Sequence, residues 1–373
     1  MHSIKSSKDV IAEDLQYICS HLKSELAELA GHRLLISGGA GFLGYYLVQT
    51  ITHWNETVVN DQKIDLTIFD NFVRGKPDWI ADLDETDQLT LVTHDITNPL
   101  PQDMGDFDFI IHAASIASPT FYRKFPIETM DANVNGLRYL LEYCRIQKEA
   151  GKPVKGFLFY SSSEVYGNPT PDNIPTPETY NGYVSCTGPR ACYDESKRYG
   201  ETLCVNFARH LQIPVKIARP FNNYGPGLKI SDRRVLPDFA RDVLANRDII
   251  MLSDGSPMRT FCYVADAIVG YYKILVKGTP GESYNIGTSK PEISMAQLAE
   301  KVVQISRELF GYTGRFKHQP SKEVDYLVDN PDRRCPIIAK AESELEYHPS
   351  ISLNEGLKRS LIWYADYNVG EDA

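Results

Sequence analysis

The stretch His32-Arg33-Leu34-Leu35-Ile36-Ser37-Gly38-Gly39-Ala40-Gly41-Phe42-Leu43-Gly44 decides the fold of this chain of 373 residues. Its first six residues predict a short buried strand and residues 45–51 predict a helix, so the glycines form the turn between them. The first glycine permits a tight turn, the second lets the backbone approach a pyrophosphate, and the third lets the helix pack close to the strand. The N–H groups at the start of the helix favour an anion there. We therefore predict a dinucleotide site lined by Gly38, Gly41, Phe42, Leu43 and Gly44.

A second strand, over residues 65–69, ends in Asp70 and Asn71. In a dinucleotide-binding fold, an acid at this place contacts the hydroxyls of the adenosine ribose. It would repel a 2′-phosphate about 4 Å away by roughly 4 kcal/mol at an intermediate dielectric, so we expect NAD rather than NADP as the cofactor. Arg74 follows closely and would weaken this preference if it turned toward the ribose.

Two further strands extend the cofactor site. Residues 89–92 lead to Asp95 and Ile96, which we place at the edge of the adenine. Residues 107–111 lead to Ala113 and Ala114, whose small side chains let the chain pass close to a flat ligand.

Strands alternate with helices through the first part of the chain, which predicts an α/β fold with a doubly wound parallel (Rossmann) sheet. We expect a helical extension at 1–31, an NAD-binding Rossmann domain at 32–221 to which residues of about 261–286 return, and a smaller α/β substrate-binding domain at 222–373. Apolar residues recur at helical spacing between residues 10 and 29, so the extension should pack on the domain or on a second subunit. A helix over residues 127–147 has an apolar face for core packing or for subunit pairing.

Hydroxyl and carboxyl side chains follow another buried strand, over residues 157–160. Ser162, Ser163 and Glu164 emerge there. Because parallel sheets place their ligand sites at the carboxyl ends of their strands, we expect these side chains at the mouth that the glycine turn defines.

Tyr193 and Lys197 lie one turn apart on the next predicted helix. A nearby ammonium favours the phenolate, and a tyrosine whose pKa is lowered in this way is a usable general base near neutral pH. The alternative is a chance pair on a solvated helix. The position of the pair beside the strand ends favours the catalytic interpretation.

Composition excludes several classes of function. Apolar residues make up 42% and charged residues 24% of the chain, which is ordinary for a soluble globular protein, and the net charge of -10 argues against a nucleic acid or an anionic membrane as partner. The seven scattered cysteines contain no CxxC pair and the chain has no HExxH motif, so we expect no metal site and reduced thiols in a cytoplasm. No stretch approaches the roughly 18 apolar residues that a membrane span requires.

Taken in order, these motifs resemble the extended short-chain dehydrogenase/reductase family across residues of about 32–365. Within this family of NAD-dependent epimerases and dehydratases, the likeness is greatest to UDP-glucuronate decarboxylases. The stretches that support it are Asp70-Asn71-Phe72, Ala117-Ser118-Pro119, Ser163-Glu164-Val165-Tyr166-Gly167, Cys192-Tyr193-Asp194-Glu195, Phe221-Asn222, Arg234-Val235, Arg259-Thr260-Phe261-Cys262-Tyr263-Val264, Pro331-Asp332-Arg333-Arg334-Cys335-Pro336 and Leu345-Glu346-Tyr347-His348-Pro349.

The resemblance implies a role for each matched position. Tyr193 is the base, Lys197 its partner at the nicotinamide ribose, and Ser162 the hydroxyl that binds the sugar 4-hydroxyl. Ser163, Glu164 and Arg259 take catalytic positions, the last two tied to decarboxylation. The positions that match contacts to the substrate are Ser118, Glu164, Asn222, Arg234, Arg259 and Arg334. A homodimer paired through helices 127–147 and 192–210 is also implied.

By the same resemblance, the reaction oxidises C4 of UDP-glucuronate with NAD⁺, releases CO₂ from the 4-keto sugar and returns the hydride to give UDP-xylose. Three alternatives stay open. An NDP-sugar 4-epimerase needs only Tyr193 and NAD, which leaves Glu164 and Arg259 with less to do. A 4,6-dehydratase needs an acid at the position of Ser163. A non-catalytic sugar-nucleotide-binding protein would not need both Tyr193 and Lys197.

Overall fold

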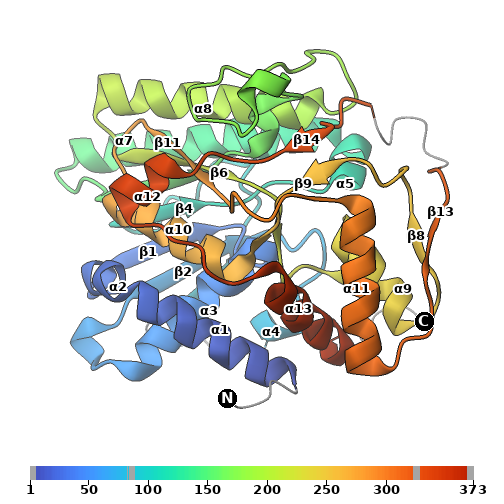
Figure 1. Ribbon diagram of the computed structural model, residues 1–373. Helices are drawn as coiled ribbons and strands as arrows, with labels where there is room; N and C mark the ends of the chain where they lie inside the picture. The colour runs from blue at the N-terminus through green and yellow to red at the C-terminus, as the bar shows by residue number, and fades with distance from the viewer. Residues whose placement is uncertain (1–5, 82, 84–88, 322–327, 368–373) are drawn as a thin grey trace.

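A parallel sheet of seven strands forms the centre of the computed structural model, which describes residues 6–81, 83, 89–321 and 328–367 (Figure 1). The strand order is β11-β6-β5-β4-β1-β2-β3, and all neighbouring strands are parallel. The strands are β1 (Arg33–Ser37), β2 (Asp65–Asp70), β3 (Leu89–Thr93), β4 (Phe109–His112), β5 (Gly156–Tyr160), β6 (Val215–Pro220) and β11 (Ser283–Ile286). The central strands are almost wholly buried, as expected for a sheet covered on both faces. The predicted doubly wound α/β fold is confirmed.

Helices cover both faces of this sheet, and two apolar clusters fill the spaces between the layers. Figure 1 shows α7 and α8 above the sheet and α1, α2 and α3 below it. The helices on the lower face are α1 (Ser7–His21), α2 (Lys23–Leu29), α3 (Phe42–Thr57) and α10 (Val264–Lys277). Those on the upper face are α6 (Pro126–Asp131), α7 (Leu137–Glu149) and α8 (Ala191–Leu211).

The helix expected over residues 127–147 is longer and less regular than predicted. It consists of α6, a π-helical turn at Ala132–Gly136, and α7. At the π turn, Asn133 Nδ2 donates to Ser196 Oγ of α8 at 2.9 Å. Such turns occur often at functional sites, and this one borders the cavity described below.

The N-terminal extension forms two helices instead of one, with a break at Leu22. Its apolar side chains are buried, and α1 packs on α3, α10 and α13 (Leu353–Tyr367). The buried Asp14 accepts hydrogen bonds from the hydroxyls of Tyr46 and Tyr263 and pairs with Arg359 of α13. The prediction of a helical segment packed on the domain is therefore confirmed for the described part; residues 1–5 lie outside the described residues.

Beyond residue 222 the described chain forms shorter elements, several of which lie near the carboxyl ends of the strands. Two small sheets have the orders β12-β9-β14 and β13-β8, and β10 pairs with β7. In between, α10 and β11 return to the main sheet, where β11 pairs with β6. The elements are β7 (Asn223–Tyr224), α9 (Val235–Leu244), β8 (Ile249–Met251), β9 (Met258–Arg259), β10 (Cys262–Tyr263), β12 (Ile293–Ser294), α11 (Met295–Phe310), β13 (Phe316–His318), β14 (Arg333–Arg334) and α12 (Ala339–Leu345). The division into three domains stays a prediction.

The remaining short helices are α4 (Asp78–Ala81), α5 (Pro119–Lys124) and the 3-10 turns η1 (Asn60–Gln62), η3 (Ser163–Tyr166), η4 (Pro171–Asn173) and η5 (Ile230–Asp232). Three of these elements matter for the site. Both η3 and α5 follow strands of the main sheet, and η5 precedes α9.

Candidate active site

A cavity of about 1100 Å³ lies at the carboxyl ends of β1, β2, β4, β5 and β6. Parallel sheets bind their ligands at this edge. Residues of α9, β9 and β14 line the other side, so the cavity lies between the sheet and the C-terminal part of the chain. Every site residue predicted from the sequence lines this one cavity.

The glycine turn has the shape that a dinucleotide requires. Gly38 has φ +80°, and a Cβ there would lie 2.5 Å from the backbone nitrogen of Ala114. Gly41 is the N-cap of α3, so the free N–H groups of the helix start face the cavity. A Cβ at Gly44 would lie 2.2 Å from the carbonyl oxygen of Gly39, so the helix packs directly on the turn. These observations fit a bound pyrophosphate.

Asp70 lies at the end of β2 and binds the glycine turn. Its carboxylate accepts hydrogen bonds from the backbone N–H groups of Ala40 and Phe72, both at 2.9 Å. Burial raises the pKa of Asp70 from its usual range. Arg74 does not pair with Asp70, because its guanidinium pairs with Asp232 at 2.8 Å (Nη1 to Oδ2).

The predicted adenine contacts also meet at this edge. Asn71 Nδ2 donates to Asp95 Oδ2 at 3.0 Å. Ile96 is buried and lies against Gly136 of the π turn. Ala113 donates its N–H to the carbonyl of Ser37, and Ala114 lies against Gly38, so small side chains follow the turn as predicted.

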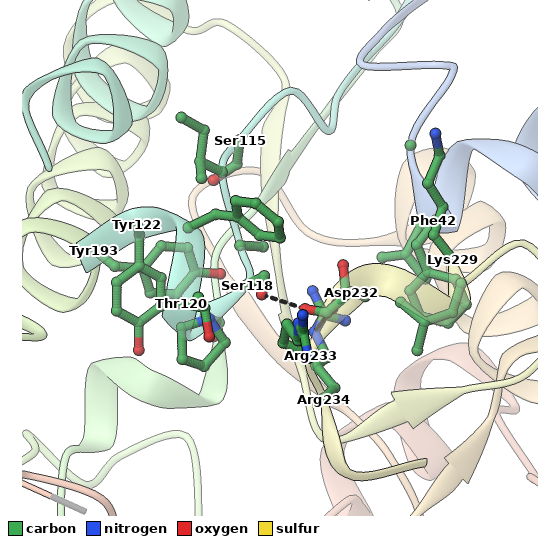
Figure 2. A pocket seen from close by; sticks show the side chains of 18 of the residues that line it. Phe42, Ser115, Ser118, Thr120, Tyr122, Tyr193, Lys229, Asp232, Arg233 and Arg234 are labelled. Atoms are coloured by element: carbon green, nitrogen blue, oxygen red, sulfur yellow. Dashed lines mark hydrogen bonds and ion pairs between the residues drawn. The ribbon is translucent and has the colours of Figure 1, made fainter. Parts of the chain in front are cut away.

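Tyr193 and Lys197 both lie on α8, and both are buried. Lys197 Nζ lies 5.6 Å from the centre of the Tyr193 ring and donates to the carbonyl of Tyr160 at 2.8 Å. The ring of Tyr193 stacks on that of Tyr122 of α5, with centres 5.1 Å apart and planes 13° apart. Figure 2 shows the two rings side by side in the cavity.

The expected lowering of the tyrosine pKa by Lys197 is wrong in this structure. Burial raises the pKa of Tyr193 to about 12, although a hydrogen bond with Ser162 opposes this shift. Burial lowers the pKa of Lys197 to about 7. Both shifts have the same largest cause: the fold removes both side chains from water, and burial penalises the charged form of each. The carboxylates of Glu164 and Asp194 raise the pKa of Tyr193 further.

Glu164 forms the electrostatic centre of the cavity. It accepts two hydrogen bonds from Arg334 of β14, of 2.7 Å (Nη1 to Oε1) and 2.5 Å (Nη2 to Oε2), and a third contact of 2.6 Å from Arg190 Nη2. Burial opposes its ionisation, but the two guanidinium groups prevail and hold the pKa at about 2. Glu164 is therefore an ion at neutral pH, and Ser163 beside it is a buried hydroxyl that lines the cavity.

Arg259 and Arg334 lie at paired positions of β9 and β14. The resemblance ties Arg259 to decarboxylation and gives Arg334 a contact to the substrate, and both roles stay predictions. In the structure Arg334 contacts Glu164. Arg259 is buried, and its guanidinium donates to the carbonyls of Met258 (2.8 Å), Asp332 (3.1 Å) and Pro331. Burial, with the charge of Arg334, lowers its pKa to about 9.

The remaining predicted substrate contacts lie around Asp232 and directly before β7. Ser118 Oγ donates to the carbonyl oxygen of Asp232 at 2.7 Å, which Figure 2 marks with a dashed line. Arg234 Nε pairs with Asp232 Oδ1 at 2.9 Å. Asn222, which has φ +43°, donates its amide to the carbonyl of Thr260 at 2.9 Å.

The cavity residues that were not predicted from the sequence include Tyr122, Arg190 and Asp232. Arg190 precedes α8 directly, and its spacing to Asp194 was the one available signal for an ion pair; their atoms Nε and Oδ2 lie 3.7 Å apart. Tyr122 carried no such signal, because its partner Tyr193 lies far away along the chain. Asp232 pairs with the nearby Arg234 as well as with the distant Arg74, and no periodic pattern marks either pair.

The described residues contain no group of three or more potential metal ligands among His, Cys, Asp and Glu. Among the helices that the structure describes, none is long and apolar enough to cross a membrane.

Comparisons with known proteins agree with this geometry. Residues 34–287 match the NAD dependent epimerase/dehydratase family. The chain is 36% identical to UDP-glucuronic acid decarboxylase 5 of Arabidopsis thaliana over 328 residues, which cover 87% of both chains. It is 32% identical to UDP-glucuronic acid decarboxylase 1 of Xenopus tropicalis, over 91% of this chain and 73% of that one. Among solved structures, a dTDP-glucose 4,6-dehydratase of Streptomyces venezuelae with NAD bound has a TM-score of 0.73 at 25% identity, over 89% of this chain and 96% of that one.

Proposed function

The chain belongs to the NAD-dependent epimerase/dehydratase family, and from that premise we propose that it converts UDP-glucuronate to UDP-xylose by NAD-dependent decarboxylation. One observation supports this activity above the others: an ionised, largely buried glutamate and three buried arginines share the cavity of the Tyr193–Lys197 pair. The decarboxylases named above are similar over most of the chain.

The residues of the glycine turn, with Asp70, would hold NAD, which when bound supplies the hydride acceptor and donor for C4 of the sugar. Tyr193 is the group placed to take the proton of the 4-hydroxyl. Ser162, hydrogen-bonded to Tyr193, would orient that hydroxyl, and Lys197 would orient the cofactor ribose. Because Tyr193 is buried and its pKa is about 12, it needs a positive charge nearby in order to act as a base at neutral pH.

Arg259 and Arg334 would serve the step in which CO₂ leaves. Loss of CO₂ from a 4-keto sugar leaves negative charge on the ketone oxygen and C5, and fixed cations in a buried site stabilise such charge. Glu164 cannot donate a proton at neutral pH, since it is ionised. Its role is instead to hold the guanidinium of Arg334, and with it the C-terminal part of the site, against the sheet.

Incubation with UDP-glucuronate and NAD⁺ tests the proposal. We expect CO₂ release and UDP-xylose, and we expect Tyr193→Phe to reduce turnover by about 10²–10⁴-fold with NAD still bound. Tyr199→Phe, an exposed tyrosine on the same helix, is the matched control and should retain full activity. UDP-galacturonate formed without CO₂ would identify an epimerase and contradict the proposal, as would full activity of Tyr193→Phe.

We further propose that the chain acts as a homodimer in the cytoplasm. Exposed apolar side chains on α7 and α8, Ile146 and Tyr199, support pairing through these two helices. All seven cysteines are free thiols, which suits a reducing compartment.

A further inference from the structure

One unassigned side chain, Arg190, contacts both chemical centres of the cavity. We propose that Arg190 is a positioning residue for the decarboxylation, which fixes the carboxylate of Glu164 directly and the ring of Tyr193 through Tyr122. The inference rests on the function proposed above and adds a residue to which neither the sequence motifs nor the relatives' names assign a role.

The first contact is with Glu164. Arg190 Nη2 lies 2.6 Å from Glu164 Oε2, and the arginine side chain is 5% exposed. Glu164 lies on η3, which follows β5, whereas Arg190 is the N-cap residue of α8, three positions before Tyr193. Arg190 therefore joins the carboxylate to the helix that carries the base. Arg334 cannot make this connection, because it belongs to β14 in the C-terminal part of the chain.

The second contact is with the ring of Tyr122. The guanidinium carbon of Arg190 lies 5.7 Å from the centre of that ring, and Tyr122 in turn stacks on Tyr193. The Tyr122 hydroxyl is buried and has no hydrogen-bond partner among the described residues. The position of the ring therefore depends on contacts of its faces and edges, and Arg190 is one of them. A cation over an aromatic face is attractive, more strongly so where water is excluded.

The charge of Arg190 also affects the pKa of Glu164. The charged and titratable groups that act on Glu164 or are acted on by it are Arg190, Arg259, Arg334, Asp194, Tyr122 and Tyr193. Of the attractions that lower the pKa of Glu164, that of Arg190 is the largest. Without Arg190, Glu164 would keep Arg334 as its direct partner, so its pKa would rise and its carboxylate would lose one of two fixed contacts.

The test compares Arg190→Met and Arg190→Lys, each alone and combined with Glu164→Gln. We expect Arg190→Met to reduce kcat by about 10²-fold, because small misplacement of reacting groups has effects of this size, while KM changes much less. The acid limb of the kcat–pH profile should move to higher pH. Arg190→Lys should recover part of kcat, since it restores the charge without the planar fork. In the Glu164→Gln background, the same substitutions should have little further effect on the acid limb.

Arg219→Met is the matched control. Arg219 is a largely buried arginine that, like Arg190, is bound to a glutamate, in this case Glu201 of α8, but it does not line the cavity. Its loss should lower the melting temperature as much as that of Arg190, with the acid limb unmoved. An unchanged acid limb in both Arg190 variants, or a rise in KM with unchanged kcat, would overturn the proposal; the latter would make Arg190 a substrate-binding residue.

Thermal unfolding gives a readout that does not depend on the reaction. In a double-mutant cycle of Arg190→Lys and Glu164→Gln, the double variant should lose clearly less stability than the sum of the single losses. Additive losses would refute the Arg190–Glu164 link. A wild-type protein that releases no CO₂ but shows this coupling would refute the proposed function and leave the positioning contact intact.

Discussion

Lys197 is a cation that the fold buries with one direct hydrogen bond, to the carbonyl of Tyr160. Burial lowers its pKa to about 7 from a usual value of 10.5. Between pH 7 and pH 10.5, Lys197 therefore binds fewer protons in the folded state than in the unfolded state. The stability of the protein should therefore rise with pH across the window from about 7 to about 10.

Lys197→Met should stabilise the protein at pH 7 while abolishing activity. Each pKa unit corresponds to about 1.4 kcal/mol, so the buried ammonium costs several kcal/mol, against about 1 kcal/mol for the lost hydrogen bond. We expect a net gain of about 1–2 kcal/mol, a typical size for substitutions that relieve a functional site. Thermal unfolding between pH 6 and 10 measures it, and the gain should shrink as the pH rises.

Lys216→Met is the control for this prediction. Lys216 is a buried lysine whose pKa burial lowers to about 8, but it lies outside the cavity. Its replacement should also raise stability at pH 7 and leave turnover unchanged. A Lys197→Met protein less stable than the wild type at every pH would show that the ammonium is not penalised.

For single residues, the sequence predicted which side chains belong to the site better than it predicted their burial and pKa values. The spacing of Tyr193 and Lys197, which puts them one helical turn apart, predicted the pair only together with its position beside the strand ends. The predicted direction of the shift in the pKa of Tyr193 was wrong, because burial of its side chain depends on how distant segments pack over the helix. Tyr122 could not be found from the sequence, since its contact with Tyr193 joins residues 71 positions apart without any periodic pattern.

Among the elements, the turn between β1 and α3 shows how a local motif sets a site. Gly38 has a positive φ and lies against Ala114, and Gly44 lies against the carbonyl of Gly39. Gly41 differs from both: it has φ −79°, and a Cβ there would approach only the carbonyl oxygen of Gly38, at 3.3 Å. We therefore expect Gly41 to leave room for a ligand, whereas the other two glycines are needed for the fold itself.

Gly41→Ala should separate binding from folding. We expect a loss of less than about 1 kcal/mol of stability, the size of an unfavourable N-cap substitution, and at least tenfold weaker binding of NAD in a titration calorimeter. Gly38→Ala should instead lower the melting temperature severely, because its Cβ would collide with backbone. Equal NAD affinity in the wild type and Gly41→Ala would show that the pyrophosphate of NAD does not bind at this turn.

The elements themselves were largely predictable, because glycine spacing and apolar runs are local. The π turn at Ala132–Gly136 was not, since its sequence keeps an ordinary helical pattern and only packing against Ile96 and Ser196 distinguishes it. The pairing of β9 with β14 also escaped prediction. Each has only two residues, and their pairing brings Arg334 to Arg259.

In the whole molecule, the two ends of the described chain meet around a buried charge. Asp14 of α1 is fully buried and pairs with Arg359 of α13, while the hydroxyls of Tyr46 and Tyr263 donate to it. Glu13, the neighbour of Asp14, contacts the same arginine at 3.1 Å but is 39% exposed. The two acids therefore form a matched pair for measuring the effect of burial.

Asp14→Ala should destabilise the protein by about 2–4 kcal/mol, because it leaves two buried hydroxyls and part of a guanidinium without partners. Glu13→Ala, the exposed counterpart, should cost at most about 1 kcal/mol. Denaturant titration of both variants gives the comparison. Equal losses would show that the N-terminal helices contribute no more than a surface contact.

The sequence predicted the extension as a helical segment but not this bond network, because nothing in the pattern of residues 10–29 indicates which distant arginine Asp14 reaches. It did place residues of about 261–286 back in the sheet, where β11 pairs with β6. That strand order has a consequence for biosynthesis. When the chain has been synthesised as far as β6, the outer side of β6 has no paired strand. Residues 221–282 must be synthesised before β11 can pair with it. The seven-stranded sheet can therefore be completed only after residues 283–286 have been synthesised.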